Sequence, residues 1–126
     1  MNGANTDIYV GKSQIEKELS IVFDEGDDIL EGIRTAMREH HVDECQAMSA
    51  DGELRDATIN YYVHSRYTTH ELKSGRIVNC SGRFMNLKDG IYGDLHVGFM
   101  LGMQLWDGTL VKGKAKQGFQ IRLRFK

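Results

Sequence analysis

The sequence of 126 residues contains no proline, so its turns must depend on glycine, asparagine and aspartate. It has two cysteines, Cys45 and Cys80, and its polar start, MNGANTD, lacks the apolar core of a secretory signal. We therefore expect free thiols in a cytoplasmic protein. No apolar run reaches the roughly 20 residues of a membrane span, so a membrane is not an expected partner.

The apolar residues that are present suffice for one hydrophobic core. Hydrophobic residues make up 40% of the chain and charged residues 27%, which is typical of a globular domain. A length of 126 residues corresponds to one domain. We expect residues 1–12 to form a disordered or loosely packed tail and residues 13–126 to form that domain.

One helix is predicted, over residues 28–40. Apolar residues recur in it at four-residue spacing: Ile29, Ile33 and Met37. Asp28 and Glu31 form a capping box at its start.

Short runs with strand-like alternation surround this helix, separated by clusters of glycine, asparagine and aspartate. They cover residues 15–23, 44–48, 56–63, 67–72, 76–85, 94–101, 109–115 and 119–125. One helix with a mostly antiparallel sheet defines an α+β fold.

Four stretches in this order resemble the PPC domain, the domain conserved in plants and prokaryotes. They are FDEGDDILEGIRTAMREHHV, GELRDATINYY, RIVNCSGRFM, and DLHVGF with the LGMQLWDGTLV that follows it. The resemblance covers residues 15–125 and implies a compact α+β domain that assembles as a homotrimer. Prokaryotic members are often labelled as DNA-binding proteins of unsettled role. The resemblance thus implies a non-enzymatic, regulatory module without a cofactor, whose partners are itself and either DNA or another protein.

Many prokaryotic relatives carry His-x-His on one strand and a third histidine in the hairpin that follows; here the matching positions are Asp94, His96 and Gln104. Residues two apart on a strand share a face, and zinc accepts imidazole and carboxylate, whereas a neutral amide is a weak ligand. Three interpretations stay open: a zinc site, a ligand pocket near a subunit interface that could also serve an enzyme, and a purely structural role.

Arg55, Asp56 and Arg83 flank glycine turns. They are candidates for the lining of a polar cleft, and the alternative is that they are surface charges beside turns.

The C-terminal segment is basic although the whole chain carries a net charge of −2. Six basic residues and no acid lie between 112 and 126: Lys112, Lys114, Lys116, Arg122, Arg124 and Lys126. If the two strands of this segment pair as a hairpin, their outer faces form a positive ladder suited to phosphates. The alternative is a solvated face whose lysines discourage aggregation of sheet edges.

The stretch VGFMLGMQLW is too apolar to lie exposed in a monomer. We expect a subunit contact to cover its apolar side chains: Phe99, Met100, Leu101 and Met103.

Overall fold

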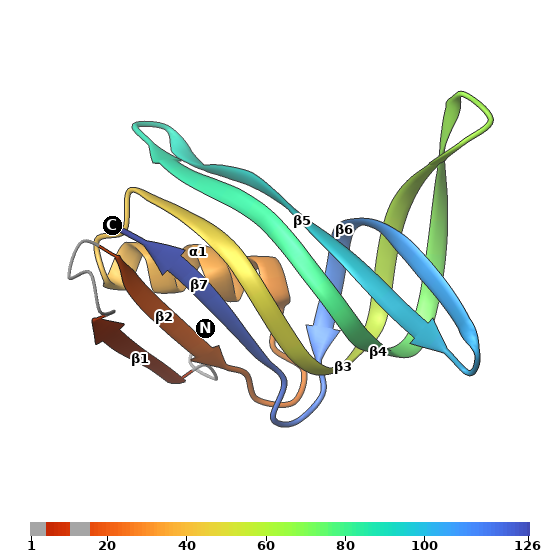
Figure 1. The fold of residues 1–126 in the computed structure, drawn as a ribbon, viewed down its shortest axis with the longest axis horizontal. Coiled ribbons are helices and arrows are strands. Elements are labelled where there is room, and N and C mark those ends of the chain that lie inside the picture. Colours follow the sequence, from red (N-terminus) through yellow and green to blue (C-terminus); the bar gives the residue numbers. More distant parts are fainter. Residues whose placement is uncertain (1–4, 11–15) are drawn as a thin grey trace.

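The computed structural model describes residues 5–10 and 16–126, which form one helix and a seven-stranded antiparallel sheet (Figure 1). The strands are β1 (Asn5–Val10), β2 (Lys17–Val22), β3 (Glu44–Val63), β4 (Arg66–Leu87), β5 (Gly90–Leu101), β6 (Gln104–Ala115) and β7 (Gln120–Phe125). They lie in the order β1-β2-β7-β3-β4-β5-β6, and β6 also pairs with β3. The predicted α+β architecture is confirmed.

The N-terminal segment contains more regular structure than the sequence suggested. Residues 5–10, which we expected to be part of a loose tail, form β1 and pair antiparallel with β2 along its whole length. Backbone hydrogen bonds to β2 order this part of the tail. The pattern of six residues does not show which strand they will pair with. The rest of the expected tail, residues 1–4, 11 and 12, lies outside the described residues.

The helix α1 spans Ile29–Glu39 and begins where the capping signal predicted. The Asp28 carboxylate accepts a hydrogen bond of 2.8 Å from the backbone N–H of Glu31, which satisfies one of the free donors of the first turn. Its apolar stripe faces the sheet, and Ile29 and Ile33 are completely buried. No helix in the described part of the chain is long and apolar enough to cross a membrane.

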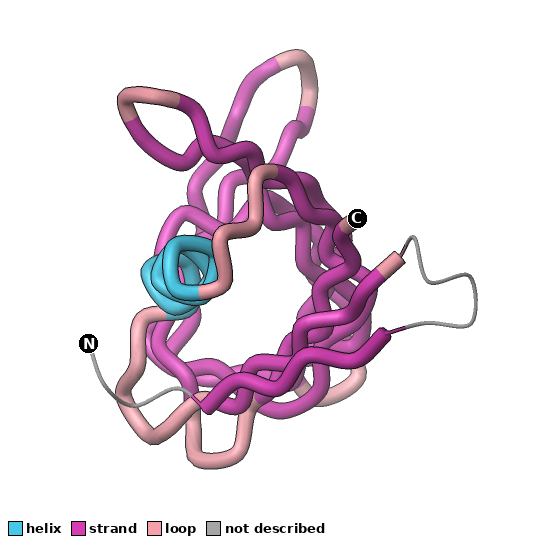
Figure 2. The backbone as a smooth tube through the Cα atoms, turned by 90° about the vertical axis from the view of Figure 1, so that its left-hand side faces the viewer, coloured by secondary structure: helices cyan, strands magenta, loops and turns pink. Residues whose placement is uncertain are grey.

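The two longest strands each join runs that the sequence had separated. Gly52 lies within β3 and Gly75 lies within β4, where the pattern indicated turns. Irregularities in register let β3 bend, so its first part pairs with β7 and its second part pairs with β6. Strands β3, β4, β5 and β6 therefore form a closed ring of paired strands. In Figure 2, which looks along the curled sheet, α1 lies beside it.

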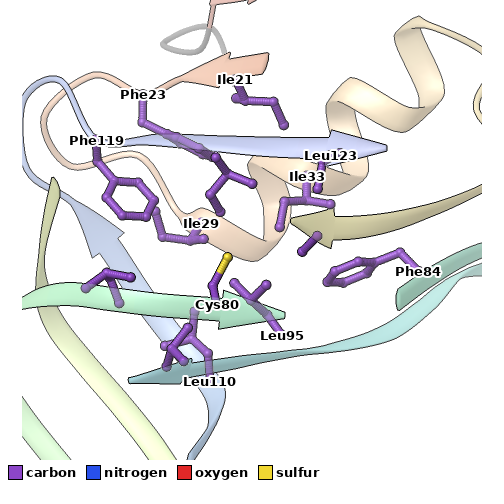
Figure 3. Packing of buried hydrophobic residues seen from close by; sticks show 14 of the residues in the cluster. Ile21, Phe23, Ile29, Ile33, Cys80, Phe84, Leu95, Leu110, Phe119 and Leu123 are labelled. Atoms are coloured by element: carbon purple, nitrogen blue, oxygen red, sulfur yellow. The ribbon is translucent and has the colours of Figure 1, made fainter. Parts of the chain in front are cut away.

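The hydrophobic core fills the space between the curled sheet and α1 (Figure 3). Phe23, Phe84 and Phe119 are almost completely buried in it. Cys45 and Cys80 are free and buried, and burial raises the pKa of each thiol to about 11. Both thiols are therefore protonated at neutral pH and behave as small apolar side chains.

Candidate functional site

A row of polar side chains crosses the closed part of the sheet on the side away from the core. Ser81 of β4 is opposite His96 of β5, His96 is opposite Thr109 of β6, and Thr109 is opposite Asn60 of β3. Asn60 is in turn opposite Thr69, so the row begins and ends on the same long strand, β4. The closure of the four strands therefore brings together residues that are far apart in sequence.

Two hydrogen bonds fix side chains within this row. The His96 Nδ1 atom lies 3.1 Å from the Thr109 hydroxyl, so the imidazole ring is oriented and its Nε2 atom remains for another partner. The Thr69 hydroxyl donates to the Asn60 side-chain carbonyl over 2.8 Å, which leaves the Asn60 amide N–H₂ as a donor.

The row borders an open cleft of about 470 Å³. The cleft is lined by Asn60, Tyr61, Tyr62, Tyr67, Asn79, His96, Val97, Asp107, Gly108 and Thr109. A Cβ atom placed on Gly98 would lie 2.6 Å from the Asn79 amide nitrogen and 2.8 Å from an Asp107 carboxylate oxygen. The missing side chain at Gly98 thus lets Asn79 and Asp107 lie over the strand, where they add donors and acceptors to the cleft.

Within one chain, Asp94 and His96 share the exposed face of β5, whereas Gln104 lies away from both. Asp94 is exposed and lies opposite Arg83, outside the cleft lining. Gln104 is opposite Leu101 at the end of the β5–β6 hairpin. It is five positions from Thr109 on β6, or about 16 Å along an extended strand.

Thr109, which sequence reasoning missed, is the residue that faces His96. A signal for it exists in the sequence. Once Gly102 and Met103 are placed at the turn, each step back along β5 matches one step forward along β6. This count leads from the pair Leu101 and Gln104 to the pair His96 and Thr109.

The residues around His96 do not fit a zinc site. Structural and catalytic zinc sites use three or four histidine, cysteine or carboxylate ligands. The cleft offers His96 and Asp107, together with neutral amides and the hydroxyl groups of Thr109 and of three tyrosines. In the part of the chain that the structure describes, no three histidine, cysteine, aspartate or glutamate residues are grouped so that they could hold a metal ion.

The other predicted cleft residues lie in two different places. Arg55 pairs with Glu25, with 2.8 Å between Nε and the carboxylate oxygen, and with its neighbour Asp56 at 3.4 Å. Arg83 instead pairs with Glu44 at 3.5 Å. It borders a second cleft, of about 430 Å³, near the C-terminal end of β7.

The basic C-terminal strands do not form the ladder that a hairpin would give. Strand β6 pairs with β3 and β5, whereas β7 pairs with β2 and β3. Two of the basic residues also form ion pairs with acids: Lys116 pairs with Glu53 at 3.0 Å, and Arg124 pairs with Glu16 at 3.8 Å. Exposed Arg122 lies between Ser20 and Ser49 on the neighbouring strands.

Comparison with known proteins defines the family. The model of the Plants and Prokaryotes Conserved (PCC) domain matches residues 10–122, so the chain belongs to this family, the one that the sequence resembled. No curated protein matches the chain.

Solved structures share the fold at low sequence identity. A metal-containing protein from Archaeoglobus fulgidus is 21% identical, with a TM-score of 0.75 over 96% of this chain and 84% of its own. A plant- and prokaryote-conserved protein from Pyrococcus horikoshii is 17% identical, with a TM-score of 0.73 over 99% and 82%. A candidate DNA-binding protein from Ralstonia eutropha JMP134 is 15% identical, with a TM-score of 0.70 over 85% and 76%.

Proposed function

We propose that this chain is a non-enzymatic binding module whose cleft around His96 takes a small polar molecule. The observation that carries the proposal is the pair of hydrogen bonds that orient His96 and Asn60 at the border of the cleft. Polar side chains fixed before a ligand arrives lose little conformational entropy when it binds. A cleft of about 470 Å³ also lies in the range of small-molecule sites.

The binding proposal is tested with a panel of sugars, nucleosides, amino acids and small carboxylates, screened by thermal shift and followed by calorimetry. We expect at least one compound to bind, and His96→Ala to weaken it roughly five- to tenfold, because one hydrogen bond is lost. The matched control is Asp94→Ala, two positions away on the exposed side of β5 and outside the cleft lining. Equal affinities of the two variants for every compound would contradict the proposal.

Homotrimeric assembly is the second part of the proposal. It is supported by membership of the family and by apolar side chains that a single chain leaves exposed at two hairpins, among them Tyr92, Met103 and Leu105. Light scattering on the purified protein is expected to give three times the chain mass of 14.3 kDa. A mass equal to one chain at all concentrations would refute it.

Nucleic-acid binding is a second candidate function, because neighbours in structure include candidate DNA-binding proteins. In this chain the side chains of Arg122 and Arg124 share one face of β7, opposite the buried Ile121 and Leu123, and Lys126 follows the end of the strand. Such a strand would contact backbone phosphates and give little sequence preference. The Glu16 carboxylate, 3.8 Å from Arg124, limits the positive potential, so the geometry favours the His96 cleft over this surface.

Salt dependence tests the nucleic-acid candidate. The slope of log affinity against log salt is negative, and each phosphate contact makes it steeper by about 0.9. The double variant Arg122→Ala with Arg124→Ala should therefore have a slope that is less steep by about 2. The control, Arg34→Ala with Arg38→Ala, removes the same charge from α1, where both arginines pair with Glu31. Fluorescence anisotropy with a labelled duplex measures the slope, and equal slopes in the two double variants would exclude β7 as the contact.

A further inference from the structure

Two exposed tyrosines stand at the end of the His96 cleft. Tyr62 and Tyr67 face each other across the β3–β4 hairpin, with ring centroids 5.2 Å apart and ring planes at 73°. Their side chains are 63% and 75% exposed, although both border the cleft. Large aromatic surfaces left in water next to a polar cleft are typical of a surface that stacks on a flat ligand.

The hairpin that carries these tyrosines is held in place from its other side. The His70 ring stacks on Trp106 of β6 with centroids 4.1 Å apart and planes at 5°. Tyr61 meets the Trp106 ring edge-on at 6.0 Å. These contacts join the hairpin to β6, so Tyr62 and Tyr67 are presented by a supported arm, which projects from the sheet in Figure 1.

The polar groups of the cleft match the edge of a planar heterocycle. The Asn60 carbonyl is used by Thr69, so its N–H₂ is a free donor. Asn79 can offer a donor and an acceptor side by side, and the Asp107 carboxylate beside it accepts hydrogen bonds. Asparagine and aspartate are side chains that pair with base edges through such patterns.

The charge of the cleft decides which part of a ligand it recognises. Its lining, among the described residues, contains the carboxylate of Asp107 and neither lysine nor arginine. A phosphate would therefore meet a negative charge without a compensating cation. The lining therefore disfavours an anionic group, and a neutral group meets no charge penalty there.

We propose that the cleft around His96 binds a nucleobase ring, stacked on Tyr67, the more exposed of the two tyrosines, and paired at its edge with Asn60, Asn79 and Asp107. The inference rests on the proposed role of this cleft as a ligand site and names the class of its ligand. The base can belong to a free nucleoside or to an unpaired position of a single strand, because both present the same ring and edge.

The test titrates adenosine, guanosine, cytidine and uridine into the full chain and records amide chemical shifts and binding heats. We expect at least one nucleoside to bind and to shift the signals of His96 and Thr109. Tyr67→Ala should weaken this binding about tenfold, since one stacking contact is lost. The matched control, Tyr92→Ala, removes an exposed tyrosine on β5 outside the cleft lining and should change the affinity less than twofold.

The second arm compares the nucleosides with ribose, glucose, an eight-nucleotide single strand and the corresponding duplex. Binding of the nucleoside or the single strand that depends on Tyr67 supports the proposal, and the ratio of the two affinities identifies the source of the base. Equal binding of ribose or glucose, or nucleoside binding that Tyr67→Ala leaves unchanged, overturns it. If no base binds but another compound binds in a way that depends on His96, the nucleobase inference fails and the proposed ligand site stands.

Discussion

Replacing Phe99 by alanine is expected to lower the free energy of unfolding by about 3–5 kcal/mol, the cost of deleting a large buried side chain. The Phe99 side chain has no exposed surface and lies opposite Trp106 in the β5–β6 hairpin. It also packs on Gly75 of β4, where an added Cβ atom would lie 3.0 Å from the Phe99 ring. Because β5 is paired with β4 on one side of Phe99 and with β6 on the other, the cavity cannot close by a small shift. Chemical denaturation at one protein concentration measures the loss.

Met103→Ala is the matched control for Phe99→Ala. Both residues belong to the apolar stretch that we expected a subunit contact to cover, yet Met103 is 99% exposed at the hairpin turn and Phe99 is buried within its own chain. The control should change the free energy of unfolding by less than about 0.5 kcal/mol in a single chain. Similar losses in the two variants would show that Met103 is buried as well, which only contact with another chain can bring about.

The features that the sequence predicted correctly depend on neighbours within a few residues. The helix start is one example, because the Asp28 carboxylate reaches the N–H of Glu31 within a single turn. The last strand is another, since Ile121, Leu123 and Phe125 alternate with exposed or half-buried residues and all three are buried. The spacing of apolar residues and the capping of a helix are local properties, so they can be predicted without knowledge of the tertiary fold.

The features that the sequence did not reveal depend on which strands meet. A glycine inside a bent strand and a glycine at a turn give the same signal, so Gly52 and Gly75 suggested breaks in β3 and β4. The bend in β3 brings Asn60 to Thr109, and alternation along either strand contains no information about this pairing. For this reason the sequence pointed to His96 but could not identify Thr109 as its neighbour on the next strand.

Gly82→Ala should destabilise the fold by about 3 kcal/mol or more, since backbone strain and steric overlap each cost roughly 1–3 kcal/mol. Gly82 has a φ of +150°, and an added Cβ atom would overlap the carbonyl oxygen of Asp94 and lie 3.2 Å from the Leu95 Cα. These are backbone atoms of the paired strand β5, so relief requires that β4 and β5 separate. His96 is the next residue on β5, and its signals should shift as well.

Gly118→Ala separates the two causes of the Gly82 effect. Gly118 also has a positive φ, +82°, but no atom lies within 4 Å of an added Cβ atom there. Only the backbone strain remains, and the expected loss is about 1 kcal/mol, measured by the same denaturation experiment. If Gly82→Ala cost no more than Gly118→Ala, β4 and β5 would not approach as closely as the structure shows. The geometry of the candidate site would then be wrong as well, because the pairing of β4 with β5 sets the position of His96.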